Sequence, residues 1–120
     1  AARRPPEGGR GGELPEWLRR EIHDVRSGRR TRLELGGLLT GLSPAGMEAL
    51  AEELQQLRTL TYLNLENNNL GGPGWEAVIH AISNLHNLEI LRLNFCGLTS
   101  REGLLVARAV SNLRCLKALG

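Results

Sequence analysis

Three histidines and two cysteines are the side chains of this chain that could support catalysis or bind a metal ion: His23, His80, His86, Cys96 and Cys115. Their spacing matches no metal-ligand pattern, and no nucleophile stands beside a base. His80 and His86 fall at positions that other copies of a repeat fill with charged residues, so we expect both in solvent. The sequence therefore predicts that the protein is not an enzyme and has no cofactor or metal site.

Glycines at Gly71, Gly72 and Gly74 form a stretch that could surround a phosphate group. A phosphate-binding P-loop also requires a lysine followed by serine or threonine, and this stretch has neither. We expect these glycines to form the entry into a helix. The adjacent acids Glu52 and Glu53 are expected on an exposed helix face.

A repeat with a fixed period organises the chain, because Leu60, Leu88 and Leu116 recur at equal intervals. Five further apolar columns keep the same register: Leu35, Leu63, Leu91 and Leu119; Leu42, Leu70 and Leu98; Leu50, Val78 and Val106; Leu54, Ile82 and Val110; Leu57, Leu85 and Leu113. A fixed period of about 28 residues is typical of a solenoid, in which strand-and-helix units stack on one continuous core.

The repeat divides the chain into three parts. Residues 1–12, rich in Arg, Pro and Gly, are predicted to be a flexible basic leader; residues 13–31 to be an N-terminal capping helix; and residues 32–120 to hold about three units and the start of a fourth. Strands are expected at Tyr62–Leu65 and Ile90–Leu93. Helices are expected from Ser43-Pro44, from Pro73 or Gly74 to Ser83, and from Ser100 to Ser111, the last with a capping box at Thr99 and Glu102.

The first unit is degenerate and allows two registers. In strict register, Arg32 takes the position of Leu60 and Gly37 the position of Leu65. In a slipped register, Leu33 and Leu35 take the positions of Leu63 and Leu65, and two residues are inserted before Leu42. Both registers remain open at this point, because terminal units are often atypical.

The motif Leu60-x-x-Leu63-x-Leu65-x-x-Asn68-x-Leu70, followed by Gly74 and a helix, resembles a leucine-rich repeat. A period of about 28 residues with a full helix is similar to the ribonuclease-inhibitor-like class. That class includes ribonuclease inhibitor, the C-terminal arrays of NOD-like receptors and the Ran GTPase-activating protein. The resemblance implies an α/β leucine-rich-repeat solenoid, a right-handed horseshoe with parallel strands on the concave side and helices on the convex side.

One column of the repeat is polar or weakly polar and is predicted to be a structural ladder: Thr40, Asn68 and Cys96. A buried asparagine amide there can bond backbone groups of neighbouring turns that would otherwise lack partners. We therefore assign this column to stability rather than to binding. Free thiols at Cys96 and Cys115 favour an intracellular, cytoplasmic protein; a mitochondrial location is the alternative if a targeting peptide has been removed.

Residues between the strand leucines must point away from the core, because side chains alternate along a strand. Strict register predicts three rows on that face: Glu34, Tyr62, Ile90 and Ala118; Gly36, Asn64, Arg92 and Gly120; Leu38, Glu66 and Asn94. Tyrosine and arginine are enriched at interface hot spots. The predicted partner-binding residues on this concave face are Tyr62, Asn64, Glu66, Ile90, Arg92, Asn94 and Phe95.

The sequence predicts a non-catalytic scaffold that binds a protein partner through the concave face. One alternative is the sensing or autoinhibitory repeat portion of a NOD-like receptor-type protein. A second is nucleic-acid contact through the Arg-rich residues 3–32, since residues 1–32 carry nine arginines against five acids. No apolar run reaches the roughly 20 residues of a membrane span. A fourth unit stops within its strand at Gly120, so we expect a fragment, or an open C-terminal edge that supports self-association.

Overall fold

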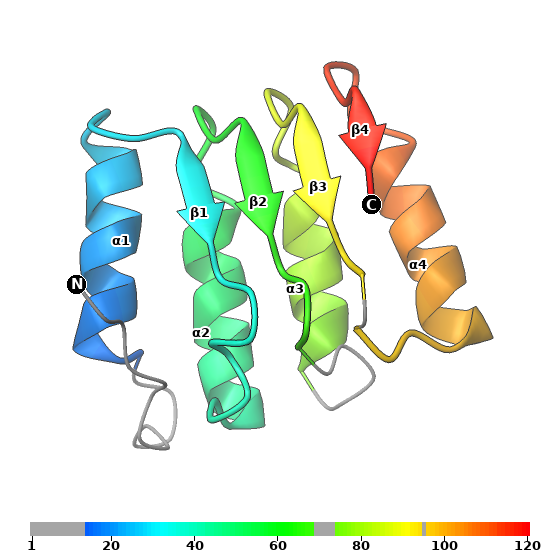
Figure 1. Cartoon of the computed structure of the whole chain (residues 1–120), viewed down its shortest axis with the longest axis horizontal. Helices are drawn as coiled ribbons and strands as arrows, with labels where there is room; N and C mark the ends of the chain where they lie inside the picture. Colours follow the sequence, from blue (N-terminus) through cyan, green and yellow to red (C-terminus); the bar gives the residue numbers. More distant parts are fainter. Residues whose placement is uncertain (1–13, 69–73, 95) are drawn as a thin grey trace.

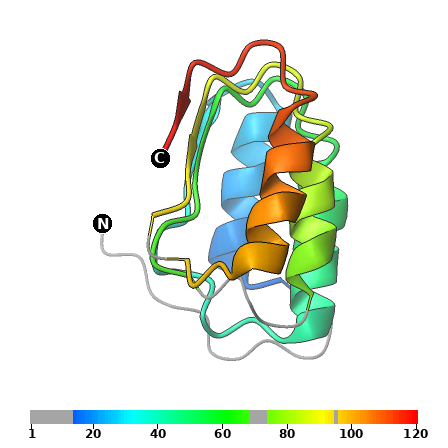
Figure 2. The same cartoon turned by 90° about the vertical axis from the view of Figure 1, so that its right-hand side faces the viewer.

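A computed structural model of the chain describes residues 14–68, 74–94 and 96–120. Helices and strands alternate along them: α1 (Glu16–Arg26), β1 (Arg32–Glu34), α2 (Pro44–Leu54), β2 (Tyr62–Asn64), α3 (Trp75–Ile82), β3 (Ile90–Arg92), α4 (Ser100–Val110) and β4 (Ala118–Leu119). The strands form one parallel sheet in the order β1-β2-β3-β4. Figure 1 shows the units side by side, and Figure 2 shows the sheet as one layer and the helices as the other.

The sheet has the slipped register in its first unit. Leu33 pairs with Leu63, whereas Leu63 pairs with Leu91, so the step from β1 to β2 is two residues longer than the step from β2 to β3. The three rows predicted from strict register are therefore wrong at β1, where Glu34 lies beside Asn64 and not beside Tyr62. The slip turns two leucines of the first unit toward the helices, and both Leu33 and Leu35 are fully buried.

The core lies between the sheet and the helices and is built from the repeat's leucine columns. Leu63 and Leu91 from the strands are fully buried, as are Leu50 and Val78 from the helices. The row of paired strand leucines that contains Leu63 and Leu91 ends at Leu119 in β4, whose side chain is 52% exposed. Stacking in register therefore buries the central units more completely than the last strand.

The helix starts agree with the local chemistry of the sequence. The Ser43 hydroxyl accepts a hydrogen bond from the Gly46 N–H at 3.0 Å, with Pro44 at the first helical position. The expected capping box at Thr99 and Glu102 is present in α4. Its hydrogen bonds from Thr99 hold the pKa of the Glu102 carboxyl below its usual value.

Gly74 precedes α3 in a left-handed conformation with φ of 91°. A Cβ atom at this position would lie 2.9 Å from the Cβ of Met47 in α2. Both the backbone conformation and the close contact require glycine here. Gly71, Gly72 and the alternative helix start at Pro73 lie outside the described residues, as do Leu70 and the leader 1–12.

Asn68 joins two neighbouring units through its buried side chain, which is 2% exposed. Its Oδ1 accepts from the Leu39 N–H at 3.0 Å, and its Nδ2 donates to the carbonyls of Leu35 at 3.0 Å and Leu65 at 2.9 Å. Cys96 lies one unit further on, where its thiol contacts the Leu65 carbonyl at 3.0 Å. Burial raises the pKa of this thiol.

Thr40 does not belong to this ladder. Thr40 is exposed. In the first unit it is the Leu39 backbone N–H that bonds the Asn68 side chain. The assignment of Thr40 followed from strict register, and the two-residue slip of the first unit removes it from the column.

Replacing Leu63 with alanine is expected to lower the free energy of unfolding by about 2–5 kcal/mol, because the fully buried side chain leaves a cavity between sheet and helices. Leu104→Ala is the matched control, since Leu104 is 54% exposed on α4 and should change stability by less than about 0.5 kcal/mol. Urea unfolding followed by circular dichroism measures both. Equal stability of the two variants would contradict the placement of Leu63 in the core.

Replacing Asn68 with alanine is expected to cost about 2–4 kcal/mol of unfolding free energy, because the N–H of Leu39 and the carbonyls of Leu35 and Leu65 lose a buried partner. The control is Asn112→Ala at an exposed position after α4, expected within about 0.5 kcal/mol of the parent. Thermal or urea unfolding measures the free energy of unfolding of both variants. A neutral Asn68→Ala variant would show that these backbone groups find other partners.

Candidate interaction surface on the sheet

Among residues 14–68, 74–94 and 96–120, no helix covers the face of the sheet that points away from α1–α4 (Figure 2). We call it the open face and define it by the outward-pointing residues of the strands and the positions that follow them: Arg32, Glu34, Tyr62, Asn64, Glu66, Ile90, Arg92, Asn94 and Ala118. The same alternation that buries Leu33, Leu63 and Leu91 places these residues on the outside.

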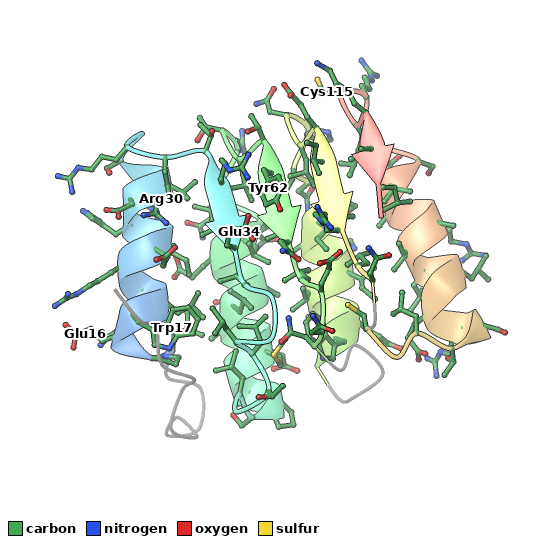
Figure 3. The ribbon with its side chains drawn as sticks, in the orientation of Figure 1. Glu16, Trp17, Arg30, Glu34, Tyr62 and Cys115 are labelled. Atoms are coloured by element: carbon green, nitrogen blue, oxygen red, sulfur yellow. The ribbon has the colours of Figure 1, made fainter. Side chains whose placement is uncertain are left out.

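Tyr62 lies at the centre of the first half of the open face. The guanidinium of Arg32 stacks on its ring with 3.9 Å from Cζ to the ring centroid, in the range of a cation–π contact. Burial and a hydrogen bond to the Glu34 carboxylate raise the pKa of the Tyr62 hydroxyl. Figure 3 shows Tyr62 and Glu34 projecting from adjacent strands.

Glu34 also bridges the first two strands through its carboxylate. Its Oε1 accepts a hydrogen bond from Asn64 Nδ2 at 2.9 Å, and its Oε2 lies 3.5 Å from an Arg32 guanidinium nitrogen. The Oδ1 of Asn64 accepts from the Glu66 backbone N–H at 2.8 Å. These bonds fix the Asn64 amide on both sides.

Glu66 organises the second half of the open face in the same way. Its Oε2 accepts from Arg92 Nε at 3.1 Å and from Asn94 Nδ2 at 2.7 Å. The bond and charge of Glu66 raise the pKa of the Arg92 guanidinium. Because Asn64 bonds both the Glu34 carboxylate and the Glu66 backbone N–H, the two halves form one polar network across β1, β2 and β3.

The structure brings the predicted partner-binding residues together on the open face, apart from Phe95, which lies outside the described residues. Arg92 and Asn94 are exposed, and Asn64, Glu66 and Ile90 are half-buried. Tyr62 is only 8% exposed, because neighbouring side chains of the face cover it. Tyr62 therefore lies on the predicted face, with its side chain inside the network.

Arg32 and Glu34 complete the network, and the strict-register rows failed to place them. Strict register assigned Arg32 to the column of Leu60 and set Glu34 beside Tyr62. The signal that could have found them is the Leu33–Leu35 pair, whose spacing of two residues matches Leu63–Leu65. Any two residues flanking a strand leucine share the outer face.

The remaining chemistry-bearing residues do not converge. His23, His80 and His86 are exposed, and both cysteines are free thiols, Cys96 buried and Cys115 exposed in a loop (Figure 3). Within residues 14–68, 74–94 and 96–120, no group of three or more His, Cys, Asp or Glu could hold a metal ion. Among the helices that the structure describes, none has the length and apolar character to cross a membrane.

The sequence offered nucleic-acid contact through the Arg-rich residues 3–32 as an alternative. Several arginines in the described part of this segment form ion pairs within the protein. Its arginines form ion pairs with nearby carboxylates: Arg20 with Glu16, Arg26 with Glu53, Arg29 with Asp24, Arg30 with Glu21 and Asp24, and Arg32 with Glu34. Arg20, Arg26, Arg29 and Arg30 thus each have a carboxylate partner within the protein.

Comparison with known protein families finds a match over one part of the chain. A family model described as a leucine-rich repeat matches residues 56–78, which include β2 and the start of α3. Neither the curated proteins nor the solved structures include a match to the chain. Leucine-rich repeats are generally non-catalytic modules that mediate protein–protein interaction. Residues 56–78 therefore contain a leucine-rich repeat, set within a parallel sheet and a layer of helices.

Proposed function

We propose that the protein is a non-catalytic scaffold that binds a protein partner through the open face. The observation that carries this proposal is the hydrogen-bonded network of the open face, which lies on the side of the sheet without helices. The family match adds support, because leucine-rich repeats generally mediate protein–protein interaction.

We further propose that the units belong to a right-handed horseshoe of the ribonuclease-inhibitor-like class, with the open face on its concave side. Support comes from the equal steps along the chain from β2 to β3 and from β3 to β4, which pair Leu63 with Leu91 and Leu91 with Leu119. A second support is the α-helix that follows each of the first three strands, α2, α3 and α4. Wide helices behind narrow strands curve a sheet toward its uncovered side.

The network suits binding because it holds its side chains before a partner arrives. A long, mobile side chain loses about 0.5–1.5 kcal/mol of conformational freedom when an interface immobilises it. Arg92 is already held by Glu66, and Arg32 is already stacked on Tyr62. Both arginine side chains are therefore ordered before a partner binds, so binding costs less conformational entropy.

Photo-crosslinking from the open face tests the proposal. A benzoylphenylalanine at Asn94, an exposed open-face position, is expected to give a discrete covalent adduct with one protein in cell extract, identified by mass spectrometry. The matched control carries the same group at Glu48, an exposed position on α2, and should give no such adduct. Crosslinking from Glu48 alone, or from neither position, would remove the open face as the binding surface.

A further inference from the structure

We propose that the open face recognises an acidic peptide segment, whose carboxylates bind Arg32 and Arg92 on the two sides of Tyr62. This inference rests on the proposed function, since it specifies the chemistry of the partner at the same surface. It follows from the hydrogen-bonding capacity that remains on the open face once the internal network is complete.

Arg32 retains most of its donors. A guanidinium carries five N–H groups in a planar fork, and Arg32 engages one carboxylate oxygen at 3.5 Å and the ring face of Tyr62. Its side chain is 58% exposed. Stacking on the ring fixes the plane of the fork while leaving its outer edge toward solvent.

Arg92 is also held by a neighbouring side chain of the open face, that of Glu66. Its Nε donates to Glu66 at 3.1 Å, and its side chain is 47% exposed. The supporting Glu66 side chain is only 15% exposed, so the carboxylate lies deeper in the face than the guanidinium it holds. The terminal nitrogens of Arg92 therefore form the outer part of this pair.

The acceptors of the open face are more fully used than its donors. Glu34 accepts from Asn64 and Tyr62 and pairs with Arg32. One oxygen of Glu66 accepts from both Arg92 and Asn94. The four charged side chains sum to zero, yet the hydrogen-bonding capacity left over is mainly that of guanidinium donors. Planar forks of this kind match carboxylates in bidentate geometry.

The separation of the two arginines indicates a peptide rather than a single carboxylate. Arg32 lies on β1 and Arg92 on β3, with β2 between them. Two strand spacings and an offset along the strand place their backbones roughly 10–12 Å apart. Each guanidinium can therefore take its own carboxylate from an extended segment that crosses the strands.

A second polar region is a weaker candidate for anions. A groove of about 630 Å³ at the ends of α2 and α3 is lined by Gln55, Gln56, Arg58, Asn84, His86 and Asn87. Helix C-termini direct partial negative charge toward this groove, and that charge favours cations and opposes a bound anion. In the described chain Arg58 forms no ion pair, which makes it a suitable control.

An NMR titration of the isotope-labelled full chain with a hexaglutamate peptide tests the inference. We expect amide shifts centred on Tyr62, Asn64 and Arg92. Arg32→Gln and Arg92→Gln should each weaken binding about three- to fivefold, the range of an exposed ion pair. Arg58→Gln removes the same charge and should change the affinity less than twofold. Raising the ionic strength should weaken binding to the parent chain.

Several outcomes would overturn the acidic-peptide assignment: no binding of hexaglutamate, shifts confined to the groove at Arg58, an Arg58→Gln effect as large as that of Arg92→Gln, or equal binding of inorganic phosphate. Unchanged spectra away from the substitutions show that the variants remain folded. An adduct at Asn94 without a response to hexaglutamate would leave the proposed function standing and overturn only this inference. Loss of that adduct would overturn both.

Discussion

Each strand-and-helix unit has to share its apolar face with a neighbour, and this constraint determines the rest of the structure. A single short strand with one helix cannot enclose its leucines. Stacking in parallel register places Leu33, Leu63 and Leu91 in one buried row. Asn68 supports the same stacking by bonding backbone groups of two successive units.

The constraint on the core also fixes the chemistry of the open face. Alternation along a strand forces the residues that flank each buried leucine to the outside, about 4.8 Å from their counterparts on the next strand. At that distance charged side chains interact across strands, and like charges would be unfavourable. The open face places Glu66 beside Arg92 and Glu34 beside Asn64, so opposite or neutral partners meet.

Short sequence motifs predicted where the helices begin, but they did not determine the register of the first unit. The helix starts at Pro44 and Ser100 follow from a proline and a capping box, and both signals lie close to the helix start in sequence. Apolar columns likewise placed β2 and β3. Leu35 falls in an apolar column in either register, that of Leu63 in strict register and that of Leu65 in the slipped one, so periodicity alone left β1 undecided. The burial of Tyr62 depends on Arg32 and Glu34 from another strand, which no local pattern encodes.

The free energies of leucine burial and of loop closure explain why the first unit adopts the slipped register. Strict register would set Gly37 in the column of Leu65, whereas the slip buries both Leu33 and Leu35. Burying one additional leucine side chain stabilises the fold by about 1.5–3 kcal/mol. Two extra residues in a loop of about ten cost only about 0.2 kcal/mol of closure entropy. The core therefore sets the register, and Arg32 comes to lie against Tyr62 on the open face as a consequence of where a leucine is buried.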